Sequence, residues 1–371
     1  MTVSDARWSA ATATGYSFAL GMSSVALPLQ AVAAGYDAVE VGLLVAASAV
    51  SQIVSRLFLG RVMRRVPDWL IIAAACALLA LSCLVVVAAS APVPFLLGQI
   101  LQGVSRACFW TGSQTHVVRG EESSVKALAS INLVGNLGLL AGPIAAGVLI
   151  GEDARLALGV AAAASAVALV PACRLLRLPP FQKLADRQPG RLWRRPGVWD
   201  GCRAGITAGG WRALLGSYVP LALVEAGQSP MAVGLQIAAA NAATILGAWI
   251  VRDVDDGRAV RRILNLGTPT TGLAIAATGI CASSSLMVGL ALVVSGIAAG
   301  ALQTLGPATA ADAVHAQERG EAIAATGTFR AASLFLTPVA AAGLVAMVPL
   351  APTIAVTGLL LALPLGRRTR S

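Results

Sequence analysis

Three arginines lie inside long apolar stretches of the sequence, where a cation is costly. Arg106, Arg212 and Arg330 each fall roughly eight to twelve residues from one end of such a stretch. An arginine at the centre of a membrane helix costs about 2.5–3.5 kcal/mol on insertion scales, so it normally faces a cavity or a polar partner. A guanidinium can hold a carboxylate or phosphate through two parallel N–H groups. The three residues predict a cationic, water-filled site for an anionic solute, unless carbonyls and polar neighbours satisfy them structurally.

Other polar side chains recur at helical spacing in the same stretches. Gln102, Arg106 and Trp110 are four residues apart and share one face of a helix. A polar stripe on a membrane helix is expected to face away from lipid. The residues predicted to bind substrate are Arg106, Trp110, Asn136, Arg212, Asn241, Gln303 and Arg330.

The composition shows which elements must position these residues. The chain has 371 residues, of which 57% are hydrophobic and 12% charged, whereas soluble domains carry roughly 25% charged residues. An ordinary soluble enzyme is therefore excluded. A membrane span needs roughly 20 apolar residues, and its backbone must be helical because lipid offers no hydrogen-bond partners. The sequence predicts an all-α polytopic membrane protein with twelve transmembrane helices.

The predicted helices and their connections give an orientation. They cover residues 8–34, 39–60, 69–90, 93–116, 127–150, 154–176, 199–224, 230–251, 263–282, 286–311, 322–346 and 350–366. Basic residues follow every even-numbered helix, whereas the odd-numbered connections have almost none, with Arg155 as the exception. The positive-inside rule then places both termini in the cytoplasm. We expect a multi-pass protein of the cytoplasmic membrane, in contact with the lipid bilayer.

The two halves of the chain resemble each other. Val41-Gly42-Leu43 and Val233-Gly234-Leu235 match at an offset of 192 residues. A basic stretch with two prolines, residues 178–197, separates the halves and is typical of a cytoplasmic linker. The predicted domains are two six-helix bundles, residues 1–177 and 198–371. Parallel repeats of this kind enclose a solute site near mid-membrane and transport by alternating access.

Two groups of small and basic residues carry a family resemblance. After the second predicted helix, a Gly- and Arg-rich loop contains Gly60, Arg61, Arg64 and Arg65. In the fifth, a Gly- and Pro-containing segment contains Gly138, Gly142, Pro143 and Gly147. The chain resembles the major facilitator superfamily over essentially its whole length.

The first group is similar to the family's loop between helices 2 and 3, which normally carries an Asp where this chain has Arg64. The second is similar to the family's antiporter-type motif. The resemblance implies the fold of that family, a secondary transporter or permease, and a gating or structural role for both groups. The alternative for the second group is helix packing alone, since small residues let membrane helices approach closely.

The sequence lacks the signatures of several other classes of protein. Neither Lys126 nor Lys183 follows the glycine-rich phosphate loop of an ATP-driven pump. The six cysteines lack CxxC spacing, so no metal site and no cofactor is expected. The net charge of +10 is spread between apolar runs, which indicates topology signals and not nucleic-acid binding. We expect no enzymatic activity.

Titratable groups suited to proton coupling are few. Glu40, Glu225 and Asp312 are near helix ends, and His116 and His315 are expected to be solvated at the inner ends of their helices. The preferred prediction is a monomeric secondary transporter of a small organic anion, with a proton as a further expected partner. The first alternative is a proton-antiport efflux pump for neutral or amphipathic compounds. A non-transporting receptor or scaffold is the competing class.

Overall fold

The apolar stretches form α-helices in the computed structural model, which describes residues 3–36, 38–88, 91–120, 123–150, 153–181 and 191–363. This part of the chain contains no β-strand. It forms two compact units, one of residues 1–190 with 314–327 and the other of residues 191–313 with 328–371. The predicted all-helical fold is confirmed.

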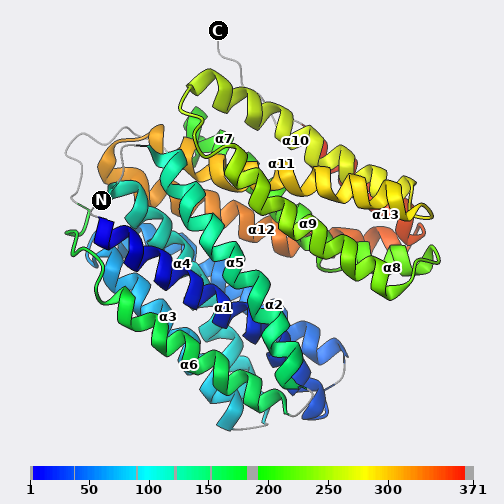
Figure 1. Cartoon of the computed structure of the whole chain (residues 1–371), viewed down its shortest axis with the longest axis horizontal. Helices are drawn as coiled ribbons and strands as arrows, with labels where there is room; N and C mark the ends of the chain where they lie inside the picture. Colours follow the sequence, from blue (N-terminus) through cyan, green and yellow to red (C-terminus); the bar gives the residue numbers. More distant parts are fainter. Residues whose placement is uncertain are drawn as a thin grey trace. The chain divides into compact units, whose positions relative to one another are not determined.

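The first unit contains the helices α1 to α6 and the beginning of α12. Their bounds are α1 Val3–Ala33, α2 Ala38–Val62, α3 Asp68–Ala88, α4 Pro92–Gly120, α5 Ser124–Ile150 and α6 Ala154–Ala172. The short 3-10 helix η2 (Ala316–Glu318) precedes α12 (Arg319–Val345). Helix α1 packs along α5 and α6, while α4 packs against α2 and α3. Figure 1 shows α3 and α6 running beside α1 in this unit.

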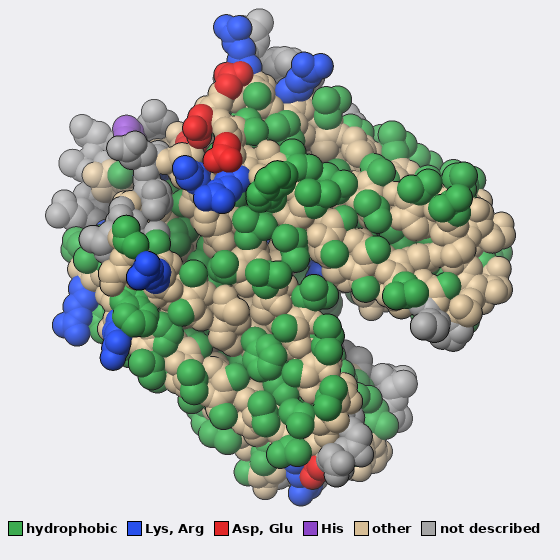
Figure 2. All heavy atoms as spheres, in the orientation of Figure 1, with side chains coloured by type: hydrophobic (Ala, Val, Ile, Leu, Met, Phe, Trp, Pro, Cys, Tyr) green, Lys and Arg blue, Asp and Glu red, His purple; other side chains and the backbone are tan. Residues whose placement is uncertain are grey.

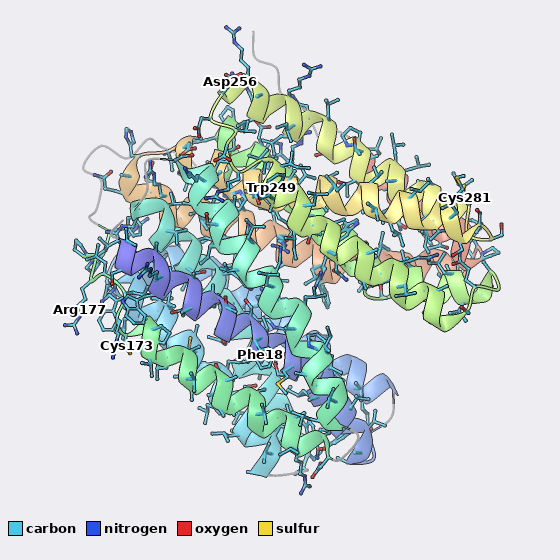
Figure 3. The ribbon with its side chains drawn as sticks, in the orientation of Figure 1. Phe18, Cys173, Arg177, Trp249, Asp256 and Cys281 are labelled. Atoms are coloured by element: carbon cyan, nitrogen blue, oxygen red, sulfur yellow. The ribbon has the colours of Figure 1, made fainter. Side chains whose placement is uncertain are left out.

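The second unit contains the remaining helices and the rest of α12. Their bounds are η1 Leu192–Arg194, α7 Pro196–Leu215, α8 Tyr218–Glu225, α9 Pro230–Ile250, α10 Gly257–Ile280, α11 Ser285–Asp312 and α13 Leu350–Ala362. Helix α11 packs against α7, α9 and α10, and α13 packs against α10. Asp256 and Cys281, which flank α10, lie at opposite ends of this unit (Figure 3).

One predicted helix is broken. The stretch 199–224 forms α7 and α8, which are separated by Gly216 and Ser217. Pro220 is the third residue of α8, where the first turn of a helix needs no N–H donor from it. The residues between Arg212 and Glu225 include no charged side chain, so an apolar stretch does not reveal the break.

The outer surfaces of the helices are apolar. Within the described residues, seven helices are long and apolar enough to cross a membrane by length and composition. Large side chains such as Leu43, Val148 and Ile280 are mostly exposed, and exposed apolar area on this scale is unusual for a soluble monomer. Figure 2 shows hydrophobic side chains along the helix flanks and charged ones mainly near helix ends. The chain is a multi-pass membrane protein.

The predicted division of the chain at residues 178–197 stays a prediction. Of that stretch, residues 182–190 lie outside the described part of the chain. Residues 176–181 follow α6 and contact the first unit, whereas Leu192 and Val198 are buried in the second. The basic C-terminal residues Arg367, Arg368 and Arg370, which contributed to the predicted orientation, are also outside the described residues.

Candidate substrate-binding site

Arg106 is held by a neutral side chain of its own helix. It lies on α4, and its Nη2 donates a hydrogen bond of 2.7 Å to Oε1 of Gln102, one turn earlier. The Nε2 of Gln102 donates to Oγ of Ser23 on α1 at 3.0 Å. The amide of Gln102 is thus fixed from both sides, with its carbonyl oxygen toward the guanidinium. The i, i+4 spacing of these residues predicted a shared face, and the contact confirms it.

A buried aromatic stack lies on the same part of α4. The rings of Tyr16 on α1 and Phe109 are 3.7 Å apart and nearly parallel. The hydroxyl of Tyr16 is 2.8 Å from Oγ of Ser105, whose own proton is donated to the carbonyl oxygen of Ala75 at 2.7 Å. Because a serine hydroxyl carries one proton, the Tyr16 hydroxyl is the donor to Ser105. This chain of hydrogen bonds ties α1, α3 and α4 together beside Arg106.

Trp110 joins this stack to α5. Its ring meets Phe109 edge to face at 5.6 Å. A Cβ at Gly135 of α5 would lie 3.0 Å from Cη2 of Trp110, so a glycine lets the indole approach that helix. The next residue, Asn136, is partly buried on α5. The predicted residues Arg106, Trp110 and Asn136 all belong to the first unit.

Arg56 is a further buried cation that the sequence analysis did not include among the binding residues. It lies on α2 and is 7% exposed. Its guanidinium occupies the space in which a Cβ at Gly327 would stand. Arg56 is close to the end of its apolar stretch. It lies four residues before Gly60, next to the loop motif. Its burial depends on tertiary contacts that no local pattern indicates.

Arg212 and Asn241 form the second pair of an arginine with an amide. Arg212 lies on α7 near the break before α8, and its Nη1 donates to Oδ1 of Asn241 on α9. The Nδ2 of Asn241 donates to the carbonyl oxygen of Ile237 at 3.0 Å, which fixes the amide. The side chain of Arg212 is otherwise exposed. The neighbouring Trp211 is fully buried and donates to Oγ of Ser295 at 2.9 Å, which anchors this part of α7.

Arg330 and Gln303 form the third pair. Nη2 of Arg330 on α12 donates to Oε1 of Gln303 on α11 at 2.9 Å. A Cβ at Gly209 of α7 would lie 3.2–3.3 Å from backbone atoms of Arg330, so the glycine allows α7 and α12 to approach closely. The four predicted residues Arg212, Asn241, Gln303 and Arg330 belong to the second unit, where they form two contacting pairs.

The three pairs share one electrostatic property. A side-chain amide oxygen accepts a hydrogen bond from a guanidinium but carries no formal charge, so it orients the cation without neutralising it. Among the described residues, no carboxylate lies within 4.0 Å of Arg106 or Arg212. A guanidinium has five N–H donors. An arginine held in this way can still offer N–H groups and its full charge to an anion.

The glycines predicted from α5 pack against α1. A Cβ at Gly138 would lie 2.9 Å from the backbone nitrogen of Phe18, and one at Gly142 would lie 2.7 Å from that of Met22. Phe18 marks this part of α1 in Figure 3. A Cβ at Gly147 would meet nothing within 4 Å. Close helix packing, together with the bend that Pro143 permits, therefore accounts for most of this motif.

The predicted loop motif contacts the start of α12. Nη2 of Arg64 donates to Oε2 of Glu321 at 2.6 Å, and each of the two side chains is about a third exposed, at 34% and 31%. A Cβ at Gly60 would lie 3.1 Å from Cγ of Glu321. Arg61 and Arg65 are exposed. Gly60 and Arg64 thus form a contact with Glu321 that the sequence did not predict.

Solvation of His116 was predicted wrongly. Its side chain is 1% exposed and lies between Asp5 and Asp68. His315 is exposed, as predicted. Glu40, Glu225 and Asp312 are exposed as well. The two aspartates are 111 and 48 residues away in the chain, so no local sequence pattern indicates this pairing.

Long apolar helices with polar side chains inside each unit define a helical, multi-pass membrane protein. A profile of the Major Facilitator Superfamily matches residues 10–338. The chain therefore belongs to the major facilitator superfamily, as the motifs predicted.

Solved structures of this fold cover nearly the whole chain. The human organic anion transporter MFSD10 (TETRAN) aligns with a TM-score of 0.79 at 15% identity, over 97% of this chain and 98% of that one. The Escherichia coli fucose:proton symporter FucP (N162A) aligns with 0.78 at 12% identity, over 96% of each chain. The proton:xylose symporter XylE, bound to 6-bromo-6-deoxy-D-glucose, aligns with 0.73 at 12% identity, over 97% and 94%. A comparison with curated proteins gave no sequence match.

Proposed function

We propose that the chain is a secondary transporter that moves a small organic anion across the cytoplasmic membrane by alternating access. Both termini would be cytoplasmic, and the protein would work as a monomeric carrier without catalysing a reaction. The residues proposed to bind the anion are Arg106, Trp110, Asn136, Arg212, Asn241, Gln303 and Arg330. Arg56 joins them as a candidate because it is a further buried cation of the first unit.

The observation that carries the proposal is the pairing of three arginines with neutral amides. Arg106, Arg212 and Arg330 donate to Gln102, Asn241 and Gln303, respectively. If Arg106 and Arg212 served structure alone, a carboxylate partner would neutralise each at lower cost in a membrane. Amides keep the charge available, and planar guanidiniums suit carboxylates and phosphates.

Trp110 supports an amphipathic substrate. Its indole lies one turn after Arg106 on α4, and it is partly exposed. An aromatic or aliphatic body could pack on the ring while the acidic group meets the guanidinium. The solved relative MFSD10 carries the description organic anion transporter, which is in keeping with this substrate class.

Proton-antiport export of neutral or amphipathic compounds remains the alternative. It was inferred from the glycines of α5, but the contacts of Gly138 and Gly142 with α1 account for them by packing. Two solved relatives are described as proton symporters, so a proton is retained as a proposed coupling ion. Glu40, Glu225 and Asp312 remain the proposed carriers in that case.

A binding screen with matched neutral analogues tests the proposal. Purified protein is mixed with benzoate, succinate or glucose 6-phosphate, or with benzamide, succinamide or glucose, and its thermal unfolding is recorded. We expect at least one anion to raise the Tm while its neutral analogue does not, followed by flux of that anion into proteoliposomes. Arg106→Gln, Arg212→Gln and Arg330→Gln should each weaken this effect, whereas Arg155→Gln, an exposed position, should not. Equal effects of anions and neutral analogues would contradict the substrate class.

A further inference from the structure

A buried cluster of charged side chains lies apart from the arginine–amide pairs, at the ends of α1, α3 and α4 predicted to be cytoplasmic. His116 of α4 is at its centre. Its Nε2 is 3.2 Å from Oδ2 of Asp5 on α1, and its Nδ1 is 3.4 Å from Oδ2 of Asp68 on α3. The side chains of His116, Asp5 and Asp68 are 1%, 5% and 0% exposed.

The geometry around His116 indicates its protonation state. A neutral imidazole has one N–H donor and one nitrogen that accepts a hydrogen bond, whereas an ionised carboxylate only accepts. Nε2 of His116 is within hydrogen-bond distance of Asp5, whereas Nδ1 makes no hydrogen bond within the described chain and lies 3.4 Å from Oδ2 of Asp68. An opposite charge within about 4–6 Å favours the charged form of a titratable group. Two carboxylates at this distance therefore favour the imidazolium.

The charges next to the imidazole favour the same state. Nη1 of Arg119, further along α4, donates to Oδ2 of Asp68 at 3.1 Å. Within the described chain, the charged groups around the imidazole are Asp5 from α1, Asp68 from α3 and Arg119 from its own helix. A protonated His116 places a positive charge between the two carboxylates, whereas a neutral ring removes it. Loss of a compensating charge from a buried site is destabilising.

The cluster also holds the chain segment that leaves α6. We call residues 174–181 the docked segment. Its backbone N–H at Leu176 donates to Oδ1 of Asp5 at 2.7 Å. Nη2 of Arg119 donates to the carbonyl oxygen of Pro179 at 2.8 Å. Two of the four charged residues of the cluster therefore bind this segment directly.

Phe181 completes the attachment of the docked segment. The guanidinium of Arg119 lies 4.4 Å from the centre of its ring, and its backbone N–H donates to the carbonyl oxygen of Met63 at 3.1 Å. The ring is buried in an apolar cluster with Leu59, Met63 and Ile71. Residues 178–181 of the docked segment are the beginning of the predicted linker. Attachment of the segment therefore holds the beginning of that linker against the first unit.

We propose that Asp5, His116 and Asp68 form a proton-binding site, and that the proton on His116 keeps the docked segment attached to the first unit. When the proton leaves, Asp5 and Asp68 lose the positive charge that lies between them. Asp5 and Asp68 must then separate or admit water, and the contacts to Leu176 and Pro179 weaken. Rising pH on the side predicted to be cytoplasmic releases the segment. This inference concerns a site separate from the proposed substrate site and does not require it.

The protonation of His116 can be observed directly. The chain has two histidines, so the His315→Gln variant leaves His116 as the single imidazole for ¹⁵N NMR of labelled, full-length protein in nanodiscs. We expect N–H signals at both ring nitrogens at neutral pH. A spectrum of neutral imidazole under those conditions would overturn the proposal.

The attachment of the docked segment is measured by hydrogen–deuterium exchange of the peptide covering residues 174–181. Exchange rates are divided by the rates of the unstructured peptide at each pH. In the wild type, protection should fall about tenfold or more once His116 is deprotonated, the size expected for losing one charge-assisted hydrogen bond. His315→Gln, the matched control at an exposed histidine, should follow the wild type.

Two variants separate the charge from folding in general. His116→Gln should leave the docked segment poorly protected at every pH, while the peptides of α9 and α11 keep their protection. Asp5→Asn removes one negative charge but keeps an oxygen that can accept from Leu176, so protection should persist at high pH. Protection that is independent of pH in the wild type, or equal pH dependence in wild type and Asp5→Asn, would overturn the proposal. No transport substrate is needed for either measurement.

Discussion

Arg64 and Glu321 form an ion pair of 2.6 Å between the end of α2 and the start of α12. The family's loop normally carries an Asp at the position of Arg64, so this chain has a cation where an anion is expected. The carboxylate of Glu321 gives that cation a partner. The loop can thus keep an ionic contact although the sign of its central charge is reversed.

A reversal of both charges tests this pair. Arg64→Glu should lower the free energy of unfolding in detergent micelles, because attraction becomes repulsion. Partly exposed ion pairs contribute about 0.2–1 kcal/mol, so the expected loss is of that order. Glu321→Arg should act similarly, and the double variant should recover most of the loss. Arg61→Glu, at an exposed neighbour, is the control for charge alone, and strictly additive losses in the double variant would contradict a direct interaction.

The close approach of α1 and α5 predicts unequal effects of two similar substitutions. Gly142→Ala places a Cβ 2.7 Å from the backbone nitrogen of Met22, so the helices must separate. Overpacking of this kind costs about 1–3 kcal/mol. Gly147→Ala lies on the same helix with nothing within 4 Å of its Cβ, so it should be neutral or slightly stabilising. Thermal unfolding of the two variants compares them, and equal Tm values would show that α1 and α5 are not in tight contact at Gly142.

The helices of this fold were largely predictable from the sequence, because the cost of burying backbone polar groups in lipid forces apolar stretches into helices. Most predicted ends agree with the structure to within a few residues, as for residues 230–251 and α9, Pro230–Ile250. The break at Gly216 and Ser217 was missed because the run of residues 213–224 contains no charged side chain that would mark it. Hydropathy predicts whether a segment lies in lipid or in water. It does not predict where a helix within that segment breaks.

The candidate site was predictable only where its contacts are local. Gln102 and Arg106 are one turn apart, and helical periodicity places them together. The partners of His116 come from α1 and α3, and they could not be found without the packing of the helices. Arg56 had the same difficulty, since its burial against Gly327 joins residues far apart in the chain.

The hydroxyl pair of Tyr16 and Ser105 predicts a non-additive mutant cycle. Ser105→Ala leaves the buried Tyr16 hydroxyl and the carbonyl oxygen of Ala75 without the partner they share. A buried unsatisfied group costs about 1–3 kcal/mol. Tyr16→Phe removes the hydroxyl, so Ser105→Ala should cost less in that background than in the wild type. The free energies of unfolding of the four proteins measure this coupling, and a coupling of zero would mean that the hydroxyls do not interact.

Adding a carboxylate beside each arginine separates the binding role of these cations from a structural one. Gln303→Glu places a negative charge where an oxygen now lies 2.9 Å from Nη2 of Arg330. The new ion pair should maintain or raise the Tm, because it adds an attraction between opposite charges at short distance. If Arg330 binds an organic anion, the same change should weaken binding of that anion at least about tenfold, through loss of a charge-assisted contact.

Gln102→Glu and Asn241→Asp make the equivalent change at Arg106 and Arg212. Gln317→Glu, an exposed position on η2, adds the same charge away from the pairs and should leave binding unchanged. The Kd of the anion selected by the thermal screen, measured alongside the Tm, distinguishes the two roles. Arginines that only stabilise the helices would give raised Tm values with unaltered Kd in all three paired variants. The proposed anion site requires that stability and binding change in opposite directions.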